Sequence, residues 1–418
     1  MLILSQSFYS VALNRRNTAY TYTGLALRLS LTLGMHRKIP KDSGMSAPER
    51  EHRIRVWWTC YALDRIYTSK IGLPIMLRDE DIDVQMPSME GLTLEEAEDF
   101  YTPELMTAQI TLARITGNMM TDLYNIPQPG KTNTFVQNVQ RILTNLRSWH
   151  ETLPQVLRLD FNAMPVYPSR SVASLHLHFG NTVIQTTRPI LFHLFRAHFA
   201  PVSGSTTPRN VSPITTALAE SCVQAARTSS SILAQLWVDG CLAPFGYFDA
   251  LSIFASTMIL MMSAAMKEND SNESDAVETA WSLLRSMKEA GSIPAQGLTD
   301  QLTDLRNDLE RLKDRRKHKT ILTPSNGGED ADGLGLLLAA TNGFSNNHLP
   351  RHSGTSTPRA GVFGVGDAMG ALDDPFLQDF LQQPYRDWTT ENLGEAQSEV
   401  PPEQFQFDWE NANLFGAL

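Results

Sequence analysis

Cysteine is scarce in this chain. Its 418 residues contain three, Cys60, Cys222 and Cys241, and no two of them form a Cys-x-x-Cys pair. Isolated thiols argue against a disulfide framework and for a reducing compartment. They also exclude a binuclear zinc cluster built from these residues, because six closely spaced cysteine thiolates must surround the two zinc ions. We therefore expect an intracellular protein whose own residues hold no zinc cluster.

Long apolar runs are absent too. No uninterrupted apolar stretch reaches about 18 residues, the length that a membrane-spanning helix needs. The nearest one, residues 248–262, is interrupted by Asp249 and by hydroxyl side chains. Residues 1–4 are too few for the hydrophobic region of a signal peptide. We therefore expect a soluble protein with no membrane partner.

The sequence lacks the common signatures of catalysis. It contains no Gly-x-Ser-x-Gly, no P-loop and no Gly-x-Gly-x-x-Gly after a strand. The acidic residues of segment 79–83 leave a magnesium-dependent helical enzyme as a remote alternative, although such a site needs carboxylates from facing helices and only one acidic run is evident. His176 and His178 would point about 200° apart on a helix, so they cannot chelate one metal ion. We therefore predict no enzyme, no cofactor and no metal ligand in this chain.

The residues that are present predict helices. A first helix is indicated by residues that share one helical face and end at Gly34, which favours a left-handed stop: Ala19, Tyr22, Ala26, Leu29 and Leu33. Ser46 and Glu49 have the spacing of a capping box, which predicts the start of a second helix. In that helix Glu51 and Arg55 are expected to form an ion pair on the solvent side, and the tryptophans to anchor the core.

Segment 71–87 is predicted to be an ordered loop that wraps over these two helices, because Gly72 and Pro74 interrupt regular structure. Just before it, Asp64 and Arg65 are expected to join a structural ion-pair network with Arg28 or Arg37. A small-molecule effector contact remains the alternative for this pair.

Further helices are expected downstream, with breaks at residues 127–130, 200–213 and 267–275. Apolar periodicity places two of them at residues 112–123 and 135–149. Others are expected at residues 212–237, 245–266 and 276–290. A last helix carries an a/d seam that either packs on the bundle or forms a short dimer contact: Leu298, Leu302, Leu305, Leu309 and Leu312. No segment alternates like a sheet. The predicted fold is all-α, an irregular multi-helix bundle of stacked helices over residues 5–316.

The C-terminal quarter differs in composition. Residues 317–370 are predicted to be a disordered linker that begins with basic residues, which suit either a solvated helix end or a nuclear localisation signal. Residues 371–418 hold ten acidic residues and one basic residue, a charge of −9 out of the total of −10. Aromatic side chains are interspersed among these charges: Phe376, Phe380, Trp388, Phe407 and Trp409. This pattern is typical of an acidic activation segment that docks on coactivators, with a short helix near residues 376–381 packing on the bundle as the alternative.

Three successive segments between residues 19 and 88, AYTYTGLALRLSLTLGMHR, EREHRIRVWWTCYALDR and SKIGLPIMLRDEDIDVQMPS, resemble a known pattern. It is that of the middle homology region, the fungal-specific transcription factor domain, of the zinc-cluster transcription factors. The matching residues are Tyr22, Gly24, Ala26, Arg28, Leu33, Gly34, His36, Arg37, Trp57, Trp58, Asp64, Arg65, Gly72, Pro74, Asp79, Asp81, Asp83 and Pro87. Trp149 before Leu153-Pro154 also matches, and segment 175–191 resembles the family's next helix, which implies a helix that ends at Arg188-Pro189. The resemblance thus extends over about residues 18–310.

The resemblance implies a nuclear regulator of RNA polymerase II transcription that binds DNA through zinc. Because the cysteines of the cluster are missing from this chain, DNA contact would require a zinc cluster or a partner supplied from elsewhere. The chain is therefore expected to be a fragment, a truncated gene model or a family member that has lost the cluster. We predict the regulatory and activating portion of such a factor, which could form homodimers and bind a small-molecule effector. The alternative is a non-DNA-binding interaction protein that titrates a full-length relative.

Overall fold

A computed structural model describes residues 2–40, 43–124, 135–159, 169–199, 211–267 and 271–321. For residues 271–274 and 317–321 it describes the backbone only. Within these residues the chain forms α-helices, short 3-10 turns and no strand, which confirms the all-α prediction. The helices are α1 Leu2–Ala12, α2 Arg16–Thr32, α3 Ala47–Ile71, α4 Leu94–Glu98, α5 Pro103–Leu123, α6 Phe135–Glu151, α7 Arg170–Phe199, α8 Pro213–Val238, α9 Tyr247–Met266, α10 Ser271–Glu289 and α11 Ile293–Ile321. The helical part thus reaches slightly beyond the predicted limits of 5 and 316. The rest of the predicted linker and the acidic segment 371–418 lie outside the described residues.

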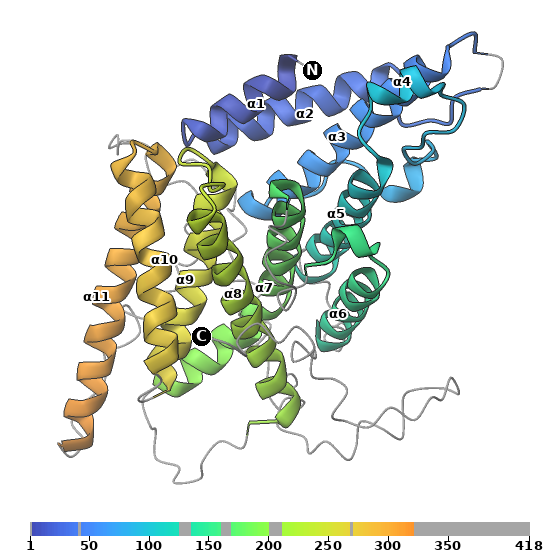
Figure 1. Cartoon of the computed structure of the whole chain (residues 1–418). Helices are drawn as coiled ribbons and strands as arrows, with labels where there is room; N and C mark the ends of the chain where they lie inside the picture. Colours follow the sequence, from blue (N-terminus) through green and yellow to red (C-terminus); the bar gives the residue numbers. More distant parts are fainter. Residues whose placement is uncertain are drawn as a thin grey trace, which may run out of the picture.

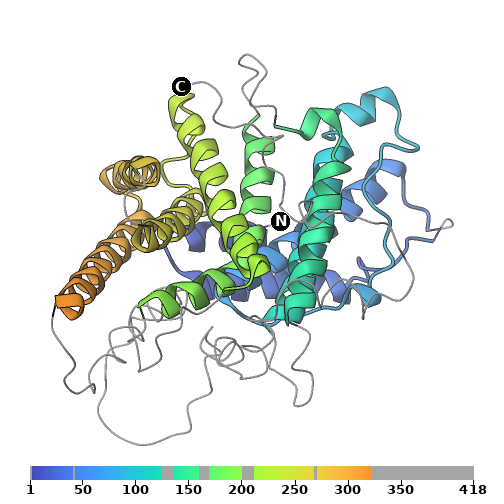
Figure 2. The same cartoon turned by 90° about the horizontal axis from the view of Figure 1, so that it is seen from below.

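Helix α7 is the central element. It packs against α8 and α9 on one side and against α5 and α6 on the other. Helices α9, α10 and α11 pack together and form one edge of the molecule, while α1 and α2 lie across one end of the bundle (Figure 1). The view from below shows α10 and α11 at one edge and α5 and α6 at the opposite edge (Figure 2).

The apolar residues form two cores. The larger one joins α5 to α11 and includes fully buried residues such as Leu112, Phe192 and Ile259. The smaller one joins α1, α2 and α3 with the loop after α3, and the predicted anchors Trp57 and Trp58 lie at its centre with no exposed surface. The a/d seam of α11 packs inside the larger core: Leu298, Leu302, Leu305 and Leu309 are buried and Leu312 is partly buried.

The predicted apolar face of α2 is buried only in part. Ala19 and Ala26 are buried, whereas Leu29 and Leu33 are 45 % and 63 % exposed. The cause is α1, a helix that the sequence analysis did not predict. Ser7 of α1 donates to the Ala19 carbonyl at 2.8 Å and its hydroxyl lies 2.8 Å from that of Thr23. Small and polar residues therefore make this close helix contact, and the two leucines at the other end of the apolar face remain exposed.

Helix α3 begins and ends as predicted. Ser46 and Glu49 form a reciprocal capping box at its start. At its end Gly72 adopts the left-handed conformation with φ of +74°, a region that residues with a Cβ atom rarely occupy. Gly34 ends α2 in the same way with φ of +66°. These glycines set where the two helices stop and the loops begin.

Helix α7 does not end at Arg188-Pro189, as predicted, but continues to Phe199. A proline inside a helix leaves the carbonyl four residues earlier without its usual donor. Here that carbonyl belongs to Gln185, and the Tyr124 hydroxyl at the end of α5 donates to it at 2.5 Å. A side chain from another helix thus replaces the missing N–H, which local sequence rules cannot foresee.

The start of α10 also differs from the prediction. Helix α10 begins at Ser271, five residues before the predicted start, so the polar run 267–275 is partly helical.

Helix α9 is long and apolar enough to cross a membrane by length and composition, but 83 % of its most apolar window is buried inside the molecule. Such burial is typical of the core helix of a folded domain.

Candidate functional site

The loop between α3 and α4 wraps over the two preceding helices, as predicted. The backbone N–H groups of Asp83 and Val84 both donate to the His36 carbonyl at 3.1 Å. Trp58 of α3 donates from its indole N–H to the Gln85 carbonyl at 2.8 Å. These hydrogen bonds hold the loop on the α2–α3 pair and exclude water from the buried tryptophans.

An ion-pair network is buried beneath this loop. Arg65 is only 1 % exposed and pairs with Asp64 and with Asp79, each at 3.0 Å. Tyr61 donates to the same Asp79 carboxylate at 2.8 Å. Burial raises the pKa of Asp64, and the adjacent guanidinium opposes that rise. The predicted partners were wrong: Asp79 from the loop replaces Arg28, which is exposed, and Arg37.

The Arg65 side chain fits closely against α5. A Cβ placed on Gly117 of that helix would lie 2.8 Å from Arg65 Nε and 3.1 Å from its Cδ. Glycine is therefore required here for close approach and not for a special backbone angle. The network thus joins α3 and the loop, and its arginine packs directly on α5.

The Glu51–Arg55 pair is formed, with 2.5 Å between Arg55 Nε and Glu51 Oε1, but its predicted location is wrong. The side chains are 6 % and 14 % exposed, so the pair is buried and does not face solvent. Glu51 also accepts from the backbone N–H of Ser88, and Arg55 donates to the Tyr101 carbonyl. The pair thus ties the far end of the wrapping loop to α3.

The acidic residues of the loop have structural partners. Asp83 pairs with Arg37 at 3.2 Å, and Asp81 pairs with Arg78 at 3.2 Å. Within the described part of the chain no three His, Cys, Asp or Glu side chains are grouped in a way that could hold a metal ion. The ion pair of Asp83 therefore ties the loop to the segment after α2, whereas that of Asp81 lies within the loop.

The other residues of the family motif occupy varied surroundings. Tyr22 and Gly24 are half-buried on α2, Pro74 is exposed, and Pro87 is buried at the end of the loop. His36 lies against Trp57 with 5.7 Å between ring centroids. The described motif residues therefore form the α2–α3 pair and its covering loop, and they do not converge on one reactive centre.

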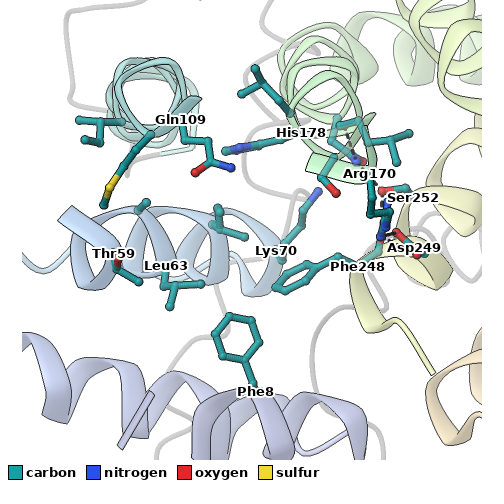
Figure 3. A pocket seen from close by; sticks show the side chains of 18 of the residues that line it. Phe8, Thr59, Leu63, Lys70, Gln109, Arg170, His178, Phe248, Asp249 and Ser252 are labelled. Carbon is teal, nitrogen blue, oxygen red and sulfur yellow. Dashed lines mark hydrogen bonds and ion pairs between the residues drawn. The ribbon is translucent and has the colours of Figure 1, made fainter. Parts of the chain in front are cut away.

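A cavity of about 400 Å³ lies behind this unit, where the two cores meet. Its walls come from α1, α3, α5, α7 and α9, and Trp58 of the motif forms part of them. Lys70, Gln109 and His178 extend from three of these helices into the same space (Figure 3). The volume falls in the range of roughly 300–1,000 Å³ that is usual for small-molecule sites.

Lys70 is the unusual member of this cavity. It is 8 % exposed, and no hydrogen bond or ion pair among the described residues reaches its ammonium group. Burial, together with repulsion from Arg188, lowers the pKa of Lys70 to about 7. Burial and the charge of Lys70 in turn lower the pKa of His178 to about 3, so that this imidazole is neutral at pH 7. The position of Lys70 in the last turn of α3 offsets part of the cost through the helix dipole.

The cavity wall also contains a satisfied carboxylate. Asp249 accepts from Arg170 at 2.6 and 2.8 Å and from the backbone N–H of Ala243 at 3.3 Å. Burial raises the pKa of Asp249, while the pairing with Arg170 opposes the rise. This acid is already engaged and does not neutralise Lys70.

Sequence reasoning did not find this cavity. Its polar residues come from separate helices, since Lys70, Gln109 and His178 are spread over more than 100 positions of the chain. A lysine in the last turn of a helix also has an ordinary explanation in the helix dipole. His176 and His178, predicted to point about 200° apart, lie in different surroundings. His176 is buried against the Leu157 carbonyl at 2.8 Å, and His178 lines the cavity. The five aromatic residues of the predicted activation segment lie outside the described residues.

Comparison with known proteins bears on the α1–α6 part of the fold. Residues 2–151 match the fungal specific transcription factor domain. Similar proteins include Activator of stress genes 1 of Saccharomyces cerevisiae, 26 % identical over 324 residues, which cover 73 % of this chain and 32 % of that protein. Thiamine repressible genes regulatory protein thi1 of Schizosaccharomyces pombe is 26 % identical over 268 residues, 64 % of this chain and 32 % of thi1. Transcriptional activator protein acu-15 of Neurospora crassa is 31 % identical over 168 residues, 38 % of this chain and 18 % of acu-15.

The chain spans about a third of the length of the first two of these relatives. No solved structure matches it. The domain match ends at residue 151, whereas the predicted resemblance reached about residue 310, and the longer alignment with Activator of stress genes 1 extends beyond the domain. Residues 2–151 thus match the fungal specific transcription factor domain, and the proteins that the chain resembles are fungal transcriptional regulators.

Proposed function

We propose that residues 5–316 are the regulatory module of a nuclear regulator of RNA polymerase II transcription, and that residues 371–418 are its activating segment. The observation that carries this proposal is the alignment of 64–73 % of the chain with proteins named as gene regulators. None of the relatives described above is named as an enzyme, which supports a non-catalytic role.

The contacts of the helical module support regulation by ligand or partner binding. The family motif builds a fastened unit of α2, α3 and loop, and a cavity lies between that unit and the rest of the bundle. A molecule in this cavity would touch both cores, so it could change how they pack. DNA contact would be made through a zinc cluster or a partner, because three cysteines cannot supply the six ligands.

The composition of residues 371–418 supports the activating role. Ten carboxylates repel one another and keep the aromatic side chains in water, where a coactivator groove can take them up. The helical module would then hold this segment inactive or release it in response to a signal.

A reporter assay tests the activating role directly. Residues 371–418 are fused to an unrelated DNA-binding domain, beside a variant in which Phe376, Phe380, Trp388, Phe407 and Trp409 are alanine. A matched control changes five neighbouring polar residues to alanine and leaves the charge intact: Gln378, Gln382, Gln383, Gln404 and Gln406. We expect strong activation that the aromatic variant loses and the glutamine variant keeps. No activation by the wild-type segment would contradict the proposal and favour a repressor.

A second candidate function is supported by the low cysteine content. It is that of an interaction protein that binds no DNA and titrates a full-length relative. Co-expression of this chain with such a relative would then reduce transcription from the relative's own target promoter. The first proposal predicts no reduction when the acidic segment is intact.

A further inference from the structure

The cavity between the two cores contains a cation without a counter-charge. The charged groups around Lys70 are Arg170 and Arg188 from α7 and Asp249 from α9, and the carboxylate is held by Arg170 and by a backbone N–H. His178 is neutral at pH 7, and Gln109 carries no charge. One guanidinium nitrogen of Arg170, Nη1, is also buried without a hydrogen-bond partner. Two cationic donors in one cavity therefore lack acceptors.

Apolar side chains make up most of the remaining wall. Trp58, Leu63 and Ile110 come from the smaller core, and Leu175 and Leu177 come from the larger one. Phe248 adds an aromatic surface at the Asp249 end. A ligand that fills this space needs an apolar body to replace water along these walls. It also needs one anionic group, because an unpaired buried charge is costly and a carboxylate–ammonium hydrogen bond is strong.

We propose that the cavity binds a small apolar molecule with a single carboxylate, whose oxygens pair with Lys70. This inference rests on the regulatory role proposed above and specifies the class of signal that the module detects. The ligand carboxylate replaces the missing counter-charge, and its apolar body contacts helices of both cores. Binding therefore stabilises the arrangement in which α3 and α7 enclose the cavity.

Calorimetry on the full 418-residue chain at pH 6.5 tests the inference. The probes are octanoate and 3-phenylpropionate, each beside its primary amide, with acetate as a carboxylate that has no apolar body. We expect both acids to bind with one site per chain and to raise the unfolding midpoint, while amides and acetate bind at least about tenfold more weakly. Equal affinity for the amides, or no binding of either acid at about 10 mM, would overturn the proposal.

Two variants place the site at Lys70. Lys70→Met should weaken the acids by about 10- to 100-fold. Because removal of a buried unpaired charge stabilises the fold, weaker binding cannot be ascribed to misfolding. Lys313→Met, at an exposed position on α11, should leave affinity unchanged. Undiminished binding to Lys70→Met would refute the site. This result is independent of the reporter assay, since the fusion contains no part of the cavity.

Discussion

Replacement of Lys70 by methionine is expected to stabilise the protein, and the effect should depend on pH. The lysine has a pKa of about 7 in the folded chain against 10.5 for the unperturbed group. The folded state therefore binds fewer protons than the unfolded state between these two values. The difference of about 3.5 pKa units corresponds to about 5 kcal/mol, at 1.36 kcal/mol per unit.

The sign follows from proton binding. Below pH 7 the lysine is charged in both states, and folding carries the whole cost of burying the charge. As the pH rises from 7 toward 10.5, the folded lysine is neutral and the unfolded one still charged, so stability rises by about 1.4 kcal/mol per pH unit. Above 10.5 the contribution of the charge has disappeared.

Urea unfolding at pH 6 and pH 9 measures the effect. Lys70→Met should be more stable than the wild type by about 5 kcal/mol at pH 6 and by about 2 kcal/mol at pH 9. Lys313→Met, exposed on the solvent side of α11, serves as the matched control and should change stability by less than about 0.5 kcal/mol. A Lys70→Met chain no more stable than the wild type, or a gain that is the same at both pH values, would show that the ammonium has a partner and would refute the reasoning.

Further substitutions test how the helices are joined. Tyr124→Phe should lower the free energy of unfolding in urea by about 1–3 kcal/mol, because it leaves the Gln185 carbonyl without a donor. Pro189→Ala in the same chain restores a backbone N–H for that carbonyl and should recover most of the loss. Gly117→Ala should lower the thermal midpoint through a clash with the buried guanidinium at 2.8 Å, whereas Gly24→Ala, where a Cβ meets nothing within 4 Å, should raise it or leave it unchanged. Leu302→Ala should lower the free energy of unfolding by about 2–5 kcal/mol and leave the molecular mass measured by light scattering unchanged. A change from dimer to monomer at unchanged stability would instead place the leucine seam of α11 between two chains.

Local signals predicted much of the α2–α3 unit. The capping box at Ser46 depends only on residues three positions apart, and the left-handed Gly34 and Gly72 end helices by their own backbone freedom. The two tryptophans are too large and apolar to remain in water, so their burial could be expected from residue type. These features were correct because each depends on neighbours in the chain.

Errors arose where a distant element determined the outcome. Leu29 and Leu33 are exposed because α1 takes the Ala19–Thr23 face of α2, and Glu51–Arg55 is buried because the loop folds over it. Pro189 does not end α7 because Tyr124 supplies a donor from another helix. Periodicity identifies apolar and polar faces, but it does not say which neighbour will cover each face.

By itself the sequence determined the helical class, the family motif, the helix boundaries at capping residues and the acidic, aromatic composition of residues 371–418. Only the tertiary structure decided which charges meet. It paired Arg65 with Asp79 and left Lys70 unpaired in a cavity between two cores. The physical reason is that helix propensity, capping and amphipathicity act over a few residues, whereas the energy of a buried charge depends on every group that packing brings within several ångströms of it.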